Sequence, residues 1–465
     1  MKKKALSLLL AAAMTVSLCA CGNTQAKATD SSEDASAEAA EASGEETAAT
    51  DSADAAGTKS YEGVTLNIAH SVTDSTSDSF DAQFAAFEEK YGCNIEVEHL
   101  SSDADEMESV ILVRAATGNL PDMWLNSVGA KLDAVSPAEN CYDLSNEDWM
   151  KERVNGSYLD IVTDQESGAV YGIPSKPSNV AGVFYNKEVY EKLGLSIPAT
   201  WEEFLANCAV IKESTEIDPV MSQYSNASGC QILFLSQYYY AQQANPEFAS
   251  QYTNKELELH DSPEYMRGLS KMYDIWENEY QNDNPLEISW EDAALAVLEG
   301  SAAHIFCRTN IMSTVETVNP EAVENVGFFP LPDEDPSVLG VASWMPEAWC
   351  ISKNSPNADL ALLLAEYLTS KEAIDEYCTK TTPTGAFMLN GIELPDNVSS
   401  AVREAQEWNE QASSPVMEYF SSIKGANMAT ILSMVGTGQY TPEEAIAEIE
   451  ADNAIDAQQK ELAGW

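Results

Sequence analysis

The N-terminal segment constrains this chain most, because it predicts the compartment in which the protein folds. Lys2–Lys4 precede an apolar run from Ala5 to Leu18, which is too short to span a bilayer. A basic start, a short apolar stretch and small residues at its end are typical of a secretory signal. We therefore predict that residues 1–20 are a signal peptide and that the rest of the chain folds outside the cytoplasmic membrane.

The end of the apolar run, Leu18-Cys19-Ala20-Cys21, resembles the lipobox of bacterial lipoproteins. Cleavage at such a site leaves Cys21 as the first residue, with its sulfur carrying diacylglycerol. Two acyl chains anchor a protein stably, whereas one binds a membrane only marginally. The sequence thus predicts lipidation of Cys21 and attachment to the extracellular face of the membrane. The alternative is an ordinary secreted protein that is cut nearby.

Composition limits the partners of the protein. Residues 21–60 are mainly small and acidic, with no aromatic residue before Tyr61, so we interpret them as a disordered acidic linker. The chain has 24 Lys and Arg against 76 Asp and Glu, a formal net charge of −52 at pH 7. So acidic a surface repels phosphate backbones, which excludes nucleic acid as a partner.

No catalytic motif is visible in the chain. It has no G-x-S-x-G sequence and no glycine-rich phosphate loop. Its histidines (His70, His99, His260 and His304) are scattered, and no cysteines are spaced as C-x-x-C, so we predict neither a metal site nor a cofactor. The seven cysteines after Cys21 are an odd number, which leaves at least one free thiol; we interpret most of them as buried apolar residues.

Alternating and helical patterns predict an α/β fold. Residues 64–69 alternate as a strand, and Asp78 is a plausible N-cap for a helix that ends near Tyr91. A second strand over 94–99, a helix over 107–117 and a third strand over 121–125 follow. Strand–helix–strand–helix–strand is the pattern of a largely parallel sheet.

The rest of the chain is richer in helices. We expect the segment from Asn397 onward to be helical, with helices that start at Pro415 and Pro442. Thr200 and Glu203 predict a capping box. The other expected helices cover residues 201–211, 263–280, 290–299, 358–369 and 371–377, and the other expected strands cover 304–307, 326–329 and 348–352.

A series of short motifs carries a family resemblance through their order and spacing. They are Phe84–Tyr91, Ala116–Asp122, Tyr171–Pro174, Val183–Lys187, Pro198–Phe204, Glu299–Ala303 and Thr441–Ala445. With them the chain resembles the extracellular solute-binding proteins of bacterial ABC importers, in the family that includes maltose-binding protein. The resemblance covers nearly everything from Val64 to Ala447.

This resemblance implies the type II periplasmic-binding-protein fold, with two α/β lobes joined at a hinge by three crossings of the chain. Residues 61–177 and 346–382 would form the N-terminal lobe, and residues 178–345 and 383–465 the C-terminal lobe. The ligand would lie between the lobes, where loops at the carboxyl ends of strands converge. The expected pocket loops are residues 70–77, 126–129, 176–181, 308–312, 343–349 and a segment around Trp408.

Candidate ligand-binding residues follow from these loops and from the chemistry of sugars. Aromatic rings stack on the C–H faces of sugars, and polar side chains bond to the hydroxyls. Arg308 has the alternative of pairing with an acid in this anionic protein. The stacking candidates are Trp290, Trp344 and Trp408, and the hydrogen-bonding candidates are Asn126, Ser127, Asn179, Arg308 and Asn310.

The function that these observations favour is capture of a sugar or oligosaccharide by a lipid-anchored receptor. The receptor would deliver this small-molecule solute to the membrane permease subunits of an ABC importer, without catalysis and without a cofactor. Three alternatives stay open. They are a receptor for another solute such as a polyamine (with a glycerol-phosphate compound disfavoured by the acidity), an extracellular glycosidase, and a surface lipoprotein that only adheres or signals.

Overall fold

The computed structural model describes residues 61–72, 74–101 and 104–465. The predicted signal peptide, the lipidation site Cys21 and the linker over 21–60 lie outside the described residues. No helix in the described part of the chain has both the length and the apolar character needed to cross a membrane.

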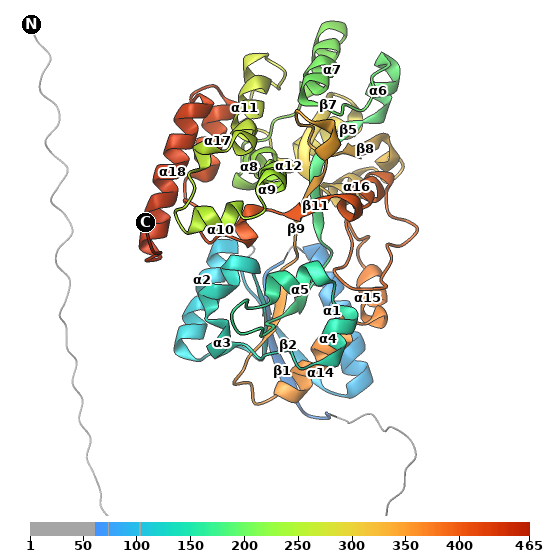
Figure 1. The fold of residues 1–465 in the computed structure, drawn as a ribbon. Helices are drawn as coiled ribbons and strands as arrows, with labels where there is room; N and C mark the ends of the chain where they lie inside the picture. Colours follow the sequence, from blue (N-terminus) through green and yellow to red (C-terminus); the bar gives the residue numbers. More distant parts are fainter. Residues whose placement is uncertain (1–60, 73, 102–103) are drawn as a thin grey trace, which may run out of the picture. The chain divides into compact units, whose positions relative to one another are not determined.

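The first lobe is built on a five-stranded sheet in the order β2-β1-β3-β10-β4 (Figure 1). β1 is parallel to β2 and β3, and β10 is antiparallel to β3 and β4. This sheet therefore recruits a strand from late in the sequence between two early ones. The strands are β1 (Thr65–His70), β2 (Asn94–His99), β3 (Met123–Asn126), β4 (Ile173–Pro174) and β10 (Ala348–Ile351).

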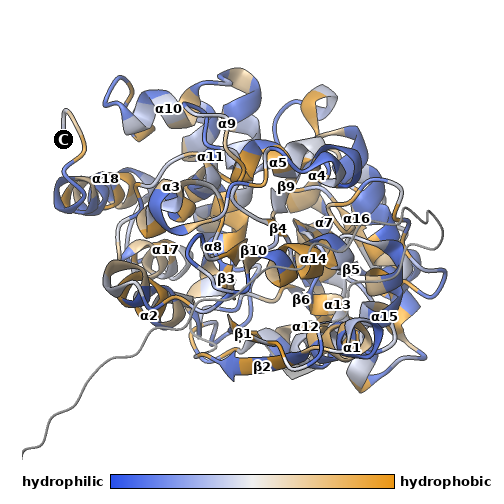
Figure 2. Ribbon diagram, turned by 90° about the horizontal axis from the view of Figure 1, so that it is seen from below, coloured by the Kyte–Doolittle hydropathy of each residue, from blue (hydrophilic) through white to orange (hydrophobic). Residues whose placement is uncertain are grey.

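Apolar side chains of α1 and α14 cover this sheet. Phe80, Phe84 and Phe87 follow one another at helical spacing and are buried with Trp124 and Trp349 of the sheet. Figure 2 shows the strongly apolar character of α14. The helices are α1 (Asp74–Tyr91), α2 (Ala104–Thr117), η1 (Gly129–Val135), α3 (Pro137–Asn140), α4 (Asp148–Arg153), α5 (Gly156–Val162), α14 (Ala358–Leu368) and α15 (Lys371–Cys378).

The second lobe has a mixed sheet in the order β11-β9-β5-β7-β6, with β8 paired to β5. Its central strand, β5, is antiparallel to β7, β8 and β9. Val183 and Phe184 in this strand are fully buried. The strands are β5 (Asn179–Asn186), β6 (Asp218–Val220), β7 (Ala302–Arg308), β8 (Val326–Phe329), β9 (Val341–Trp344) and β11 (Ser413–Pro415).

Helices on both sides enclose the second sheet. The capping box at the start of α7 forms as predicted, with Thr200 and Glu203 each accepting a backbone N–H. The helices are α6 (Lys187–Leu193), α7 (Trp201–Ser214), α8 (Ala227–Ser236), α9 (Tyr238–Ala244), α10 (Phe248–Thr253), η2 (Leu259–Asp261), α11 (Pro263–Glu277), α12 (Trp290–Glu299), α13 (Ile311–Val318), η3 (Val323–Asn325), η4 (Pro336–Val338), α16 (Ser400–Gln411), η5 (Met417–Tyr419), α17 (Met428–Gly436) and α18 (Pro442–Gln459).

The chain passes between the two sheets three times: from β4 to β5, from β9 to β10, and from α15 to α16. Hydrogen bonds join these crossings to one another. The backbone N–H and the hydroxyl of Ser175 both donate to the carbonyl oxygen of Glu347. Ser178 donates in the same two ways to the carbonyl oxygen of Ala386. The hinge is thus a small bonded unit rather than three independent linkers.

Several expected elements differ from the structure by a few residues at one end, among them the helices over 107–117 and 263–280. Two further expectations are wrong by more. α1 begins at Asp74 rather than after Asp78, because its first turn is polar and gives no apolar signal. Pro415 does not start a helix but ends β11, an edge strand, where a residue without an N–H is tolerated. The packing also draws residues 387–389, which the sequence analysis placed in the second lobe, into the first core.

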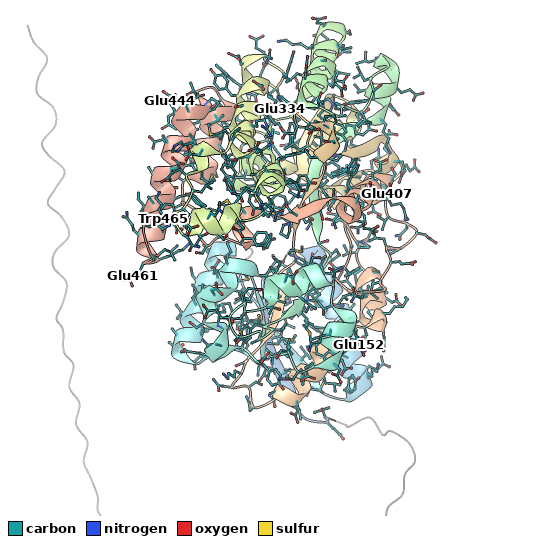
Figure 3. The ribbon with its side chains drawn as sticks, in the orientation of Figure 1. Glu152, Glu334, Glu407, Glu444, Glu461 and Trp465 are labelled. Atoms are coloured by element: carbon teal, nitrogen blue, oxygen red, sulfur yellow. The ribbon has the colours of Figure 1, made fainter. Side chains whose placement is uncertain are left out.

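Thiols and acids are distributed as the composition suggests. All seven cysteines from Cys93 onward are free, and every one except Cys378 is buried, which confirms their interpretation as apolar core residues. Many acidic side chains point away from the ribbon into solvent (Figure 3). Those labelled there are the exposed residues Glu152, Glu334, Glu407, Glu444 and Glu461.

A buried charged cluster fixes α11 against the segment after β8. Lys271, which is 2% exposed, lies 3.0 Å from Asp333 and donates to the Gln237 side chain and to the Pro332 carbonyl oxygen. Arg267 adds two bonds to Asp333. Burial lowers the pKa of Lys271 to about 8, against the opposing attraction of Asp333. Removing one partner from such a buried charged cluster lowers the stability of the fold, because the remaining charge stays buried without its counterion.

We expect Lys271→Met to lower the free energy of unfolding by about 3 kcal/mol, because it removes the ammonium that balances Asp333 and leaves two buried acceptors without a donor. Urea denaturation measures the change. Lys371→Met is the matched control, because Lys371 pairs with Asp375 on the surface and its loss should cost less than about 0.5 kcal/mol. Equal losses in the two variants would contradict this role for the cluster.

Candidate functional site

Strand pairing in the second sheet gathers three of the predicted site residues. Asn179 at the start of β5 lies opposite Trp344 at the end of β9. Two residues along β5, Ala181 lies opposite Arg308 at the end of β7. Because β7 and β9 both run antiparallel to β5, their carboxyl ends meet the beginning of β5 at the same edge of the sheet.

Arg308 lies between two tryptophan rings at this edge. Its guanidinium carbon is 5.8 Å from the ring centre of Trp290 and 5.6 Å from that of Trp344. Both separations are within the range of cation–π attraction. The Arg308 Nε is buried without a hydrogen-bond partner, and no carboxylate of the described residues lies within 4.0 Å of the guanidinium. Arg308 therefore does not form the ion pair with an acid that the sequence analysis gave as the alternative.

Hydroxyl and amide groups surround this cluster. The Asn179 Oδ1 accepts bonds from Thr309 and Thr384, while its amide N–H groups have no acceptor among the described residues. The Asn310 Oδ1, at the start of α13, is buried without a partner. These groups keep unused hydrogen-bonding capacity beside the two indole rings.

The first lobe contributes Ser127 but holds Asn126 in internal bonds. Asn126 is 5% exposed, accepts from the Trp124 indole and donates to the Ser127 carbonyl oxygen. Ser127 is half-buried and lines a cavity of about 120 Å³. Ser127 therefore faces the cavity, whereas the Asn126 side chain bonds within its own loop.

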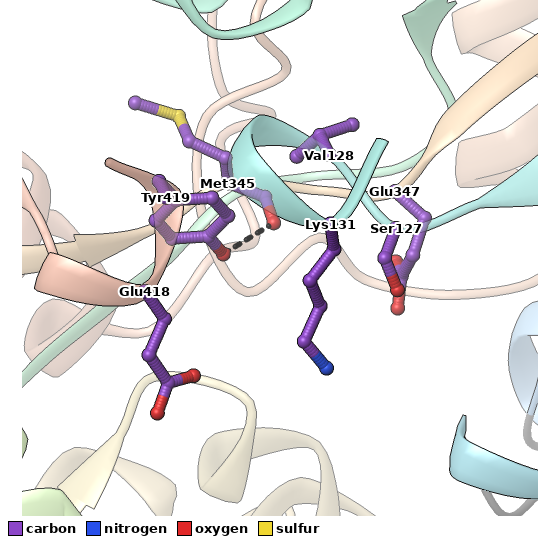
Figure 4. Close-up of a pocket in the computed structure, with 7 residues that line it drawn as sticks. All are labelled: Ser127, Val128, Lys131, Met345, Glu347, Glu418 and Tyr419. Atoms are coloured by element: carbon purple, nitrogen blue, oxygen red, sulfur yellow. Dashed lines mark hydrogen bonds between the residues drawn. The ribbon is translucent and has the colours of Figure 1, made fainter. Parts of the chain in front are cut away.

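That cavity also involves the hinge and the segment after β11 (Figure 4). Tyr419 donates its hydroxyl to the Met345 carbonyl oxygen at 3.0 Å. Gly129 permits this approach: its φ is +67°, and a Cβ there would lie 2.5 Å from the Tyr419 carbonyl oxygen. The lining residues are Ser127, Val128, Lys131, Met345, Glu347, Glu418 and Tyr419.

Glu347 is a half-buried acid that lines this cavity. Burial by itself raises the pKa of a carboxyl group, but the Lys176 ammonium at 2.8 Å, with Arg308 further off, brings the pKa of Glu347 below its ordinary value. Glu418, on the same cavity, is paired with Lys424. A glycosidase needs one carboxyl group with a raised pKa as general acid. Glu347, whose pKa is lowered, does not have that character.

A larger groove of about 790 Å³ adjoins the cavity and shares Lys131 and Glu418 with it. On one side it is lined by α2 and η1, and on the other by α8, the segment between η5 and α17, and the end of the chain after α18. Its walls alternate charged residues such as Glu108 and Lys424 with apolar ones such as Leu112 and Met428. This groove is large enough for more than one sugar ring.

Trp408 packs against the same apolar core as Trp290. It is on α16, half-buried against the core that contains Val180 and Val341. The sequence analysis missed Lys176, Glu347 and Tyr419 as site residues, although the first two lie in expected pocket loops. Tyr419 had no signal, because its segment was expected to be helical.

His70 closes the carboxyl end of β1 among aromatic rings. It is fully buried, and neither ring nitrogen has a hydrogen-bond partner. Its ring lies 5.0 Å from that of His99, 5.4 Å from Phe80 and 5.9 Å from Trp349. Burial, with a smaller effect of His99, lowers the pKa of His70 to about 4.

The family model for the bacterial extracellular solute-binding protein matches residues 73–375. The chain belongs to this family. The family is one of binding proteins and not of enzymes, in agreement with the expectation that the chain has no catalytic residues. In the part of the chain that the structure describes, no three His, Cys, Asp or Glu side chains are grouped to hold a metal ion.

Curated relatives match most of the chain. The melibiose/raffinose/stachyose-binding protein MelE of Bacillus subtilis is 24% identical over 386 residues, covering 78% of this chain and 82% of that protein. An uncharacterized ABC transporter extracellular-binding protein of Pyrococcus horikoshii is 23% identical over 369 residues, covering 75% and 83%. The chain is thus similar to these proteins along most of their length.

Solved structures confirm the two-lobe fold. An open conformation of the binding protein MsmE of Bacillus subtilis has a TM-score of 0.71 at 18% identity, covering 85% of this chain and 98% of that one. RafE with raffinose bound has a TM-score of 0.67 at 19% identity, covering 84% and 98%. A chitin oligosaccharide binding protein has a TM-score of 0.69 at 17% identity, covering 85% and 100%.

We expect His70 to make folding sensitive to acid. In the unfolded chain His70 takes a proton below about pH 6.5, whereas in the folded protein it stays neutral down to about pH 4. The free energy of unfolding therefore decreases as the pH is lowered through that window. His70→Phe fits the same aromatic surroundings and should reduce the loss of unfolding free energy between pH 7 and pH 5 by roughly 1.5 kcal/mol. Urea denaturation at both pH values measures this.

His260 supplies the control for that experiment. It is exposed, and its bond to Glu450 raises its pKa, so it stabilises the protonated folded state. His260→Gln should therefore leave the acid loss undiminished or larger. A His70→Phe variant that loses as much stability as the parent between the two pH values would show that the buried ring does not carry the effect.

Proposed function

We propose that the protein captures a sugar or oligosaccharide between its two lobes for an ABC importer. The observation that carries this proposal is the cluster of Trp290, Trp344 and Arg308 at one sheet edge. Flat indole rings bind the C–H faces of sugars, and the neighbouring amide and guanidinium groups bond to hydroxyls. A pocket with apolar faces and a few oriented polar groups is the usual form of a small-molecule site.

The relatives support the same class of ligand. The printed names of MelE and of a multiple sugar-binding protein of Streptococcus mutans describe sugar binding. RafE and a sugar transporter protein of Bacillus licheniformis were solved with raffinose and stachyose. These ligands belong to those proteins. They favour a carbohydrate here, but the pocket residues of this chain decide which one.

Capture would work through closure at the hinge. A ligand that touches both lobes stabilises the closed form by the difference between its affinities for the closed and open forms. Trp344, Arg308 and Trp290, which begins α12, come from the second lobe, and Ser127 comes from the first. The bonded crossings, with lobes as bounded in the sequence analysis except around residues 387–389, would let the lobes move as rigid bodies. The permease subunits would then bind the closed form.

The protein would act on the outer face of the cell membrane. The signal-like residues 1–20 and the lipobox that ends at Cys21 support a lipid anchor. The acidic linker over 21–60 would then give the folded lobes a reach of roughly 35 Å from the membrane. A tethered receptor stays near its importer instead of diffusing away.

We expect neutral oligosaccharides of the raffinose and stachyose type, or a related sugar from a library, to raise the melting temperature of the purified protein by mass action. Trp344→Ala should weaken the bound sugar by about tenfold or more, because it removes a stacking face. Trp276→Ala is the control, since Trp276 packs beside Gly438 at the end of α11. Calorimetric titration measures the affinities.

Two results of that screen would count against carbohydrate capture. One is a melting-temperature shift with a polyamine while no saccharide gives one. The other is release of shorter saccharides during incubation, which would reveal a glycosidase. Equal losses of sugar affinity in Trp344→Ala and Trp276→Ala would instead show that the sugar does not bind at the proposed cluster.

The lipid anchor has its own test. Cys21→Ser should abolish incorporation of labelled palmitate and move the protein from the membrane fraction to the medium, because the thioether-linked lipid cannot form. The matched variant Cys19→Ser should keep both the label and the membrane location. Retention of the Cys21→Ser protein in washed membranes, without label, would show that another contact holds it there.

A further inference from the structure

Arg308 differs from every other arginine of the chain. The sequence contains five arginines, all of them among the described residues. Four of these donate hydrogen bonds to carboxylate or carbonyl oxygens, and Arg308 donates none to a described residue. The bonded pairs are Arg114 with Glu98, Arg153 with Glu366, Arg267 with Asp333, and Arg403 with the carbonyl oxygens of Pro395 and Asp396.

This isolation is unexpected in so acidic a protein. With 76 acidic side chains against 24 basic ones, carboxylates are in large excess as partners. Glu347, a carboxylate near enough for Arg308 to help lower its pKa, is already bound at 2.8 Å by Lys176. Arg308 instead has the rings of Trp290 and Trp344 beside it. The fold thus keeps one permanent positive charge at the proposed sugar site without giving it a counterion.

Closure of the lobes makes that charge costly unless the ligand balances it. The Arg308 side chain is already half-buried, and its Nε is buried without an acceptor among the described residues. A neutral sugar would complete the desolvation and supply only hydroxyl acceptors. A carboxylate accepts two parallel N–H bonds from a guanidinium and also neutralises it. The geometry and the charge therefore both favour an acidic group on the ligand.

We propose that the ligand is an acidic carbohydrate, a uronic acid or an oligosaccharide that contains one, with its carboxylate bound to Arg308. This proposal rests on the carbohydrate function proposed above and specifies its substrate class. The sugar ring stacks on Trp344 or Trp290, and the Asn179 amide and Ser127 bond to hydroxyls. A sugar phosphate fits less well, because among the described residues of the cluster no second cation without an ion-pair partner lies beside Arg308 to balance its second negative charge.

The negative charge of the whole protein does not oppose this binding strongly. Charges farther away than about 8 Å are largely screened at physiological ionic strength. Beside Arg308, the charged residues around the cavity include two ion pairs, Lys176 with Glu347 and Lys424 with Glu418, which leave the Arg308 charge unbalanced. Long-range repulsion would slow the approach of an acidic ligand, whereas the contact with Arg308 would govern its residence.

The test compares acids with their neutral esters on the purified protein. The probes are oligomers of galacturonate, glucuronate and mannuronate, the methyl ester of each, and raffinose as a neutral sugar. We expect at least one uronate to bind about tenfold or more tightly than its methyl ester, in calorimetric titrations and in melting-temperature shifts. Raising the NaCl concentration should weaken the acid and leave the ester nearly unchanged.

Variants then assign the difference to one side chain. Arg308→Gln should weaken the acid by about 30-fold and the ester by less than about threefold, which removes the preference. Arg308→Lys keeps the positive charge but lacks the two parallel N–H donors of the guanidinium, and it should give an intermediate loss of affinity for the acid. Arg403→Gln is the matched control on α16 and should leave both affinities unchanged. Because the Arg308 side chain makes no hydrogen bond to a described residue, the melting temperature without ligand should persist in its variants.

The outcomes separate the two proposals. Equal affinity for acid and ester, or equal weakening of both by Arg308→Gln, would overturn the acidic-ligand inference and make Arg308 a donor to hydroxyls. Binding of raffinose with no uronate binding would overturn it as well, while carbohydrate capture stands. If neither neutral nor acidic saccharides bind, the carbohydrate function itself is wrong.

Discussion

The hydrogen-bonded crossing between β9 and β10 is the constraint on which the site depends. Its three consecutive carbonyl oxygens accept from three different parts of the chain: Met345 from Tyr419, Pro346 from Tyr158, and Glu347 from Ser175. These bonds position the backbone of the crossing, and the carboxylate of Glu347 pairs with Lys176 at 2.8 Å. That pairing leaves Arg308 without a counterion. One loop therefore joins the lobes and also sets the electrostatics of the cleft.

The second sheet adds the other half of the arrangement. Its central strand runs against its neighbours β7, β8 and β9, which brings Trp344 and Arg308 to one edge although 36 residues separate them in sequence. Charge and apolar surface are then combined in a single place. Such a combination suits a ligand that is partly apolar on its faces and polar at its rim, as sugars are. The remaining acids lie largely on the exposed surface, where they keep the protein soluble.

Local signals predicted much of the fold. The strand over 94–99 and the helix over 290–299 have the predicted bounds, because apolar periodicity and a capping residue determine such elements locally. The start of α1 and the strand that ends at Pro415 escaped prediction, since the first has a polar turn and the second depends on pairing with β9. Among the site candidates, Trp290, Trp344 and Arg308 could be chosen by the type of their side chains. That the Asn126 side chain bonds within its own loop became visible only in the structure.

The sequence by itself determined the family, the α/β character of both lobes and the absence of a catalytic motif, because each rests on residues that are close together in the chain. It also carries the prediction of a lipid anchor at Cys21. Only the tertiary structure decided which polar groups remain unsatisfied. Whether an arginine has an acceptor depends on contacts between segments far apart in sequence. No periodicity or motif could predict that the carboxylate of Glu347 forms an ion pair with Lys176 from another crossing.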